Sequence, residues 1–121
     1  MRNYHKLEVW KSATVLLKQV YILTGQYPKS EIYGITSQTR RAAVSIAANI
    51  AEGMGRQYKK DTIQFLHIAR GSLYELEALL QIGMTLDLID EKDFRDIINL
   101  TEDTNKLLNG LINYWEKTEL K

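Results

Sequence analysis

The segment from Arg40 to Gly53, RRAAVSIAANIAEG, constrains the fold of this chain more than any other. Wound as a helix at about 100° per residue, it sorts its side chains into three stripes. One stripe is apolar and typical of a helix core, and a polar stripe runs beside it. The third stripe carries only small apolar residues and Arg40, although a helix on the outside of a monomer normally shows water a broad charged face. We therefore expect an interface with a second copy of the chain, formed by Val44, Ala47, Ala48 and Ala51.

The polar stripe is expected to form a structural hydrogen-bond network. Ser45, Asn49 and Glu52 lie at i, i+4 and i+7 and share one helix face. These side chains need partners, because a buried polar group without one costs about 1–3 kcal/mol. A ligand pocket is the alternative interpretation of the same stripe. Gly71 indicates close helix packing, since a glycine inside a helix costs about 1 kcal/mol relative to alanine. The predicted network consists of Arg41, Ser45, Asn49, Glu52, Ser72 and Glu75.

Apolar spacing of about 3.5 residues recurs along the chain and predicts four helices. They are expected at roughly residues 4–26, 36–54, 59–86 and 91–117. Ser30 or Thr36 is the expected N-cap of the second helix, and Asp90 that of the fourth, because these side chains accept hydrogen bonds from free backbone N–H groups. Helices of similar length with short connections predict one all-α domain over residues 1–121, an antiparallel up-down-up-down four-helix bundle.

Composition limits the classes of protein to which such a bundle can belong. The chain has 121 residues and no cysteine, so disulfides and thiolate metal sites are excluded and a reducing compartment fits. We find no signal-peptide pattern. No stretch of about 18 apolar residues could span a membrane. The cytoplasm is therefore the expected location, with no membrane partner.

No catalytic, metal or cofactor site is expected. A carboxylate-bridged di-metal site in a bundle needs Glu-x-x-His pairs on facing helices. The residue three before His67 is Gln64, and the residue three before His5 is Arg2, so neither pair exists. Without cysteine, and without a serine at a suitable spacing from histidine, nucleophilic catalysis is not expected either. The sequence predicts a protein that is not an enzyme.

The net charge of +1 hides a split between the two halves of the chain. Residues 1–60 hold ten Lys or Arg and three Asp or Glu, whereas residues 61–121 hold six and twelve. Such asymmetry can mark a polyanion-binding surface. The alternative is that basic helices pack beside acidic ones, so that their fields largely cancel. Basic residues around an aromatic ring suit phosphate contact and base stacking. The candidate nucleic-acid contacts are Lys6, Lys11, Lys18, Arg56, Tyr58, Lys59 and Lys60.

Short motifs along nearly the whole chain, in order, resemble one family. They are Leu7-Glu8-Val9-Trp10, Tyr27-Pro28 followed by Glu31 and Tyr33-Gly34, Gln38, Arg40-Arg41-Ala42-Ala43-Val44-Ser45-Ile46, Asn49-Ile50-Ala51-Glu52-Gly53, and Gly71-Ser72-Leu73 with Glu75-Leu76. Together they resemble the bacterial four-helix-bundle proteins encoded by intervening sequences within 23S rRNA genes. Those proteins look related to the accessory variability protein of diversity-generating retroelements. One departure is Ala47, where we expect proline in many relatives.

The resemblance implies a cytoplasmic bundle without enzymatic activity that assembles into a homo-oligomeric ring, expected to be a homopentamer. The retroelement relatives use a basic ring surface to bind nucleic acid and to hold a reverse transcriptase. The resulting hypothesis is an oligomeric accessory or scaffold protein that associates with RNA or DNA through phosphate contacts. The alternative is an oligomeric scaffold that binds only proteins and has no affinity for nucleic acid.

Overall fold

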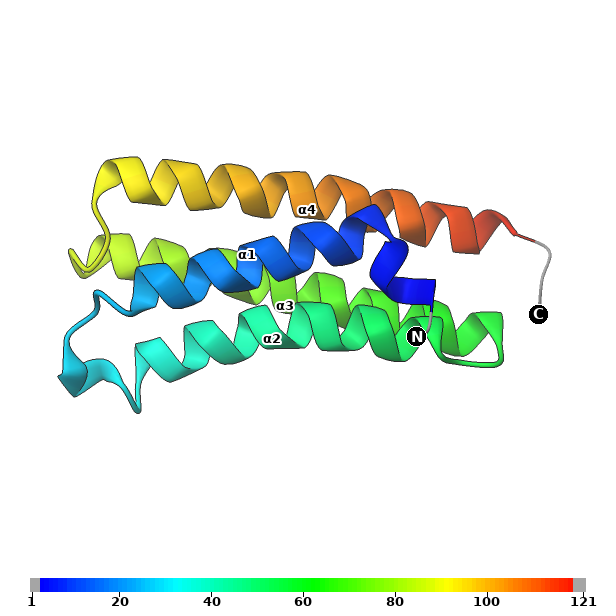
Figure 1. Ribbon diagram of the computed structural model, residues 1–121, viewed down its shortest axis with the longest axis horizontal. Coiled ribbons are helices and arrows are strands. Elements are labelled where there is room, and N and C mark those ends of the chain that lie inside the picture. The colour runs from blue at the N-terminus through cyan, green and yellow to red at the C-terminus, as the bar shows by residue number, and fades with distance from the viewer. Residues whose placement is uncertain (1–2, 119–121) are drawn as a thin grey trace.

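The computed structural model describes residues 3–118 as an all-α bundle without strands (Figure 1). α1 lies between α2 and α4, and α3 packs against α2 and α4 on the opposite side of the core. This arrangement confirms the predicted all-α, four-helix class. The helices are α1 (Glu8–Thr24), α2 (Ile35–Met54), α3 (Lys59–Thr85) and α4 (Glu91–Lys117), with short 3₁₀ helices η1 (Asn3–Lys6) and η2 (Lys29–Glu31).

Two helix starts differ from the expected ones. The first helix begins at Glu8, because Leu7 has extended backbone angles of φ −69° and ψ 138° that separate α1 from η1. α2 begins after Gly34 without a side-chain cap, so Ser30 and Thr36 are both wrong as caps. Ser30 lies inside η2, and Thr36 is buried in the first turn of α2.

The start of α4 agrees with the sequence. Asp90 is the N-cap of α4, and its Oδ1 accepts a hydrogen bond of 2.8 Å from the backbone N–H of Asp93. A carboxylate at this position satisfies one of the free N–H groups of the first turn and interacts favourably with the helix dipole. The cap therefore fixes where α4 emerges from the α3–α4 connection.

The core fills the space among the four helices with aliphatic side chains at helical spacing. Leu16 of α1, Ile46 of α2, Leu73 and Leu76 of α3 and Leu108 of α4 are fully buried. Burying one such side chain contributes about 1.5–3 kcal/mol relative to leaving it in water. The shared core therefore holds each helix at a fixed rotation about its own axis, and that rotation decides which residues remain at the surface.

α2 and α3 approach each other closely near Gly53. A Cβ atom added there would lie 3.1 Å from Cβ of Phe65 and 3.2 Å from the carbonyl oxygen of Thr62. The hydroxyl of Thr62 donates a 2.9 Å hydrogen bond to the carbonyl oxygen of Gly53. Gly53 thus permits a close contact between two helices, while α2 itself continues to Met54 and ends at Gly55.

The antiparallel topology gathers four helix ends at each end of the bundle. The start of α1, the end of α2, the start of α3 and the end of α4 lie together at one end (Figure 1). We call it the α2–α3 end, after the connection that it contains. The opposite end holds the α1–α2 and α3–α4 connections. None of the helices in residues 3–118 is both long and apolar enough to cross a membrane.

Candidate assembly and nucleic-acid surfaces

The four residues of the predicted self-interface do not share one environment. Val44 is 42% exposed and Ala48 is also exposed, whereas Ala51 is half-buried. Ala47 is only 5% exposed and packs in the core of its own bundle. The rotation of α2 turns Ala47 inward, so the structure corrects the prediction at this position. Val44 and Ala48 remain available to a second subunit.

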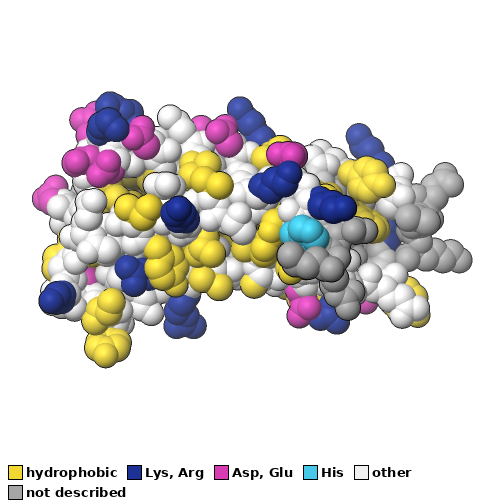
Figure 2. Space-filling view, in the orientation of Figure 1, with side chains coloured by type: hydrophobic (Ala, Val, Ile, Leu, Met, Phe, Trp, Pro, Cys, Tyr) yellow, Lys and Arg dark blue, Asp and Glu magenta, His cyan; other side chains and the backbone are white. Residues whose placement is uncertain are grey.

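Hydrophobic side chains gather along the line between α1 and α2 (Figure 2). Tyr21 of α1 is 43% exposed there, and the guanidinium of Arg40 from α2 lies 4.6 Å from the centre of its ring. The Nε of Arg40 also donates a 2.8 Å hydrogen bond to Oγ1 of Thr24. The charge on this side of α2 is therefore bound to the chain's own α1.

Part of the predicted polar network joins α2 to α3. The hydroxyl groups of Ser45 and Ser72 lie 2.7 Å apart, and Nδ2 of Asn49 donates to Oγ of Ser45 at 3.0 Å. These contacts are half-buried, and they set the register of the two helices. Three other residues of the predicted network lie exposed at the surface: Arg41, Glu52 and Glu75. Glu52 pairs with Arg56 at 3.4 Å on the exterior.

Gly71 does not mark a close packing contact within the chain. A Cβ atom added at Gly71 would meet nothing within 4 Å, and the residue is exposed in the middle of α3. The expectation drawn from its position beside Ser72 is therefore wrong for the single subunit. Glycine lowers the stability of a helix by about 1 kcal/mol relative to alanine, and no contact within the subunit offsets this loss at Gly71.

The α2–α3 end brings together basic residues from two distant segments. Lys6 from η1 and Lys60 from α3 are both exposed at this end. Tyr58, which precedes α3, is 56% exposed. Arg56 lies 4.5 Å from the centre of the Phe65 ring. An exposed aromatic ring among cations is an arrangement that suits phosphate contact and base stacking.

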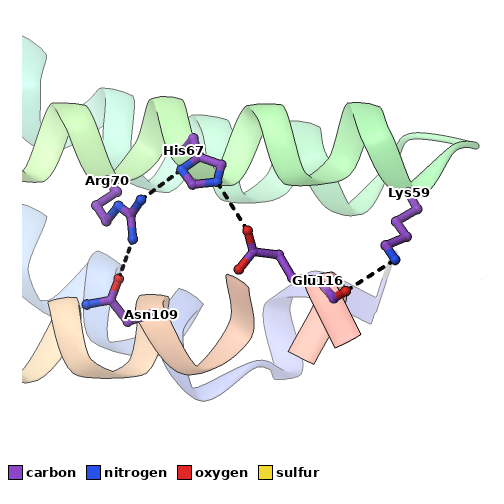
Figure 3. Close-up of polar contacts among 5 residues, drawn as sticks. All are labelled: Lys59, His67, Arg70, Asn109 and Glu116. Carbon is purple, nitrogen blue, oxygen red and sulfur yellow. Dashed lines mark hydrogen bonds and ion pairs between the residues drawn. The ribbon is translucent and has the colours of Figure 1, made fainter. Parts of the chain in front are cut away.

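Other candidate contacts have structural partners or lie elsewhere. Nζ of Lys59 donates hydrogen bonds to the carbonyl oxygens of Thr118 at 2.6 Å and Glu116 at 3.3 Å, so it caps the end of α4 (Figure 3). Lys11 pairs with Glu8 at 3.5 Å on the surface of α1. Lys18 is exposed in the middle of α1, away from the α2–α3 end. The patch with accessible charge is smaller than the sequence predicted.

A second polar network, which the sequence did not predict, joins α3 to α4 (Figure 3). Arg70 donates from Nη1 to Oδ1 of Asn109 at 2.8 Å, and its Nη2 lies 2.9 Å from Nδ1 of His67. A guanidinium only donates, so Nδ1 of His67 accepts from Arg70, and Nε2 of the same ring lies 3.9 Å from Oε2 of Glu116. In the sequence, the i, i+3 spacing of His67 and Arg70 was the signal that could have indicated this contact. The network fixes helix register.

Residues 3–118 contain no group of three or more His, Asp or Glu side chains that could hold a metal ion.

The family model described as 23S rRNA-intervening sequence protein matches residues 5–110. The chain belongs to this family. The resemblance expected from the motifs is thereby confirmed. The relation to the retroelement accessory protein stays a prediction.

A solved structure with the same fold comes from Bacteroides thetaiotaomicron VPI-5482. It is described as a protein with unknown function from the S23 ribosomal protein family. It is similar to this chain with a TM-score of 0.81 and 25% sequence identity, over 87% of this chain and 95% of that chain. No curated protein matches the chain.

The family motifs of this chain lie mainly at positions that build the bundle. Arg40 links α2 to α1, Ser45 links α2 to α3, and Gly53 permits the close contact with α3. Tyr27 is 6% exposed, and burial raises the pKa of its phenol. The motifs therefore identify the fold, and function has to be inferred from the surfaces.

One carboxylate of this chain, that of Glu77, is expected to oppose folding at neutral pH. Burial, and then the negative charge of Glu102, raise the pKa of Glu77 above its usual range. Because the raised pKa disfavours the ionised form in the folded state, we expect Glu77→Gln to stabilise the protein by about 0.5 kcal/mol at pH 7. The gain should vanish at pH 3, where Glu77 is protonated in both states. Urea unfolding at the two pH values measures it, with the exposed Glu75→Gln as control, and a loss of stability at pH 7 would contradict it.

Proposed function

We propose that this protein is an oligomeric scaffold without enzymatic activity that associates with nucleic acid through the α2–α3 end. The observation that carries the proposal is the convergence of Lys6, Arg56, Tyr58 and Lys60 at one end of the bundle. Lysine and arginine contact phosphates irrespective of sequence. Tyr58 adds a face on which an unpaired base can stack. A single patch of this size binds weakly, so the proposal requires several copies.

Self-association supplies those copies, and we propose that it uses the outer surface of α2 and α3. The Ser45–Ser72 hydrogen bond marks where these helices meet. One turn away lie Ala48 on α2 and Ile68 on α3, and Ile68 is 44% exposed. We call the exposed set Val44, Ala48, Ile68 and Gly71 the α2–α3 face.

Gly71 supports this choice of face. A glycine in the middle of an exposed helix weakens that helix and has no steric reason within the subunit. A neighbouring backbone that approaches closely in the assembly would supply the reason. A homopentameric ring is the form we propose, in keeping with the resemblance to the retroelement accessory proteins. A ring repeats the basic patch, which raises avidity without new contacts.

Binding to nucleic acid should depend steeply on salt. We expect the protein to bind a fluorescein-labelled RNA or DNA 20-mer at 50 mM salt and to lose affinity markedly at 200 mM, because binding releases counterions. The double variant Lys6→Glu/Lys60→Glu should weaken binding about tenfold or more and lower the salt slope. Fluorescence anisotropy across a salt series measures both quantities.

The matched control changes the same charge at the opposite end of the bundle. Lys29→Glu/Lys92→Glu alters the net charge equally, and both lysines are exposed there. If the two double variants lose affinity equally, the α2–α3 end is not the binding surface. If the native protein binds neither nucleic acid at 50 mM salt, the nucleic-acid proposal is wrong.

An oligomeric scaffold that binds only proteins is the second candidate function. It is favoured by the engagement of Lys59, Arg56 and Lys11 with partners inside the chain. An oligomer that binds no nucleic acid at low salt would support it. For either function we propose a cytoplasmic location, because the chain carries no cysteine and a reducing compartment fits. A reverse transcriptase remains a predicted partner.

A further inference from the structure

α1 and α4 enclose a groove of about 480 Å³ on the side of α1 that faces away from α2. Its floor is apolar and consists of Val15 and Ile22 from α1 and Ile97 and Leu100 from α4. Val15 is 51% exposed and Ile22 is 52% exposed. Two large aliphatic side chains, two turns apart on one helix, therefore face solvent in a concave surface.

The α4 rim of this groove is acidic. Asp93, Asp96 and Asp103 line it, and no Lys or Arg does. Asp96 pairs with Lys92 on its own helix at 2.9 Å. Within residues 3–118, neither Asp93 nor Asp103 has an ion-pair partner within 4.0 Å. Acidic side chains gather over the part of α4 that adjoins this groove, beside hydrophobic side chains (Figure 2).

The same face of α4 carries further exposed residues beyond the end of the groove at Asp103. Leu107, Gly110 and Tyr114 follow Leu100 and Asp103 at heptad spacing on one helix face. Leu107 is 40% exposed and Tyr114 is 62% exposed, and a Cβ atom at Gly110 would meet nothing within 4 Å. From Asp93 to Tyr114 this face of α4 is about 31 Å long, because an α-helix rises about 1.5 Å per residue. An occupant could therefore run along α4 for several turns.

We propose that this groove binds a cationic amphipathic helix of a partner protein. Helices dock into grooves by inserting apolar side chains at i, i+3 or i+4, and i+7, and the apolar floor offers sites at that spacing. Lysine or arginine on the flank of the bound helix would pair with Asp93, Asp96 and Asp103. Charge complementarity selects a basic segment, and the same carboxylates repel nucleic acid.

A second copy of this chain fits the groove less well than a separate cationic helix. Among the helices in residues 3–118, α1 is the one with exposed lysines two turns apart, Lys11 and Lys18. α1 already forms one wall of the groove. The groove also lies on a different side of the bundle from the α2–α3 face. The inference is therefore independent of the proposed nucleic-acid function.

The test uses the full-length protein and a labelled synthetic peptide of 21 residues. The peptide is an alanine-based helix with leucine at heptad positions on one face and lysine on the flank of that face. Fluorescence anisotropy should show binding of this peptide and none of the same peptide with glutamate in place of lysine. Asp96→Asn/Asp103→Asn should weaken binding about tenfold. Ile22→Ser should weaken it as well. Both variants change exposed side chains, and circular dichroism verifies that the fold is retained.

The matched control, Glu75→Gln/Asp87→Asn, removes two carboxylates outside the groove and should leave the affinity unchanged. Equal losses in both double variants, or equal binding of the two peptides, would overturn the proposal. Sedimentation velocity of the protein without peptide tests the remaining alternative, in which a second copy of the chain occupies the groove. If Ile22→Ser changes the oligomeric state, the occupant is a second copy and the proposed partner helix is wrong.

Discussion

Introducing a carboxylate at Ala48 is expected to dissociate the proposed oligomer into single subunits of 14.0 kDa. Ala48 is exposed on the outer side of α2, close to Val44, which is 42% exposed. In the subunit the new carboxylate would stay in water and leave the bundle folded. In an interface it would be buried without a partner, which costs several kcal/mol per ion. Sedimentation velocity over a range of concentrations measures the change.

Asn113→Glu provides the control for this prediction. Asn113 is exposed on α4, which does not pack against α2, so the same charge is added away from the α2–α3 face. If Ala48→Glu leaves the oligomer intact, the assembly uses another surface. If the native protein sediments as a 14.0 kDa species at working concentrations, the ring itself is wrong.

Truncating Ile46 should remove a large part of the stability of the bundle. Ile46 is fully buried in the core on the inner side of α2. Ile46→Ala leaves a cavity, and such truncations lower the free energy of unfolding by about 2–5 kcal/mol. Domains of this size have a total stability of about 5–15 kcal/mol. Urea denaturation followed by circular dichroism measures the loss.

Val44→Ala is the matched control on the same helix. Val44 lies two positions before Ile46 but faces outward, so its truncation should change the free energy of unfolding by only about 0.5 kcal/mol. Both variants are to be measured in the Ala48→Glu background, because assembly adds to apparent stability by mass action. Equal losses from the two truncations would show that α2 is rotated differently from the structure described above.

The sequence correctly predicted those features that depend on the residues of a single helix. The heptad spacing gave α2, α3 and α4 to within a residue or two, and Asp90 was identified as a cap because a cap depends on its own turn alone. Ser45, Asn49 and Ser72 meet as expected, since their spacing places them on facing stripes. The family could also be recognised, because its motifs are linear.

The predictions from the sequence were wrong where the position of a side chain depends on packing against a second helix. Ala47 and Val44 belong to one small-residue stripe, yet of the two only Val44 faces solvent, because packing in the shared core sets the rotation of α2. Lys59 was expected to face phosphate but caps α4, a neighbour that lies far along the chain. Glu52 was expected in a network with α3 and instead pairs with Arg56 at the surface. Periodicity contains no information about these rotations.

By itself, the sequence determined four amphipathic helices, the absence of cysteine chemistry, and a chain with a basic half and an acidic half. Only the tertiary structure decided which charges share an end, and that Val15 and Ile22 face Asp93 and Asp103 across one groove. Helical spacing fixes the neighbours of a residue on its own helix. Its neighbours across helices depend on how the buried side chains pack, and they arise only when the core forms.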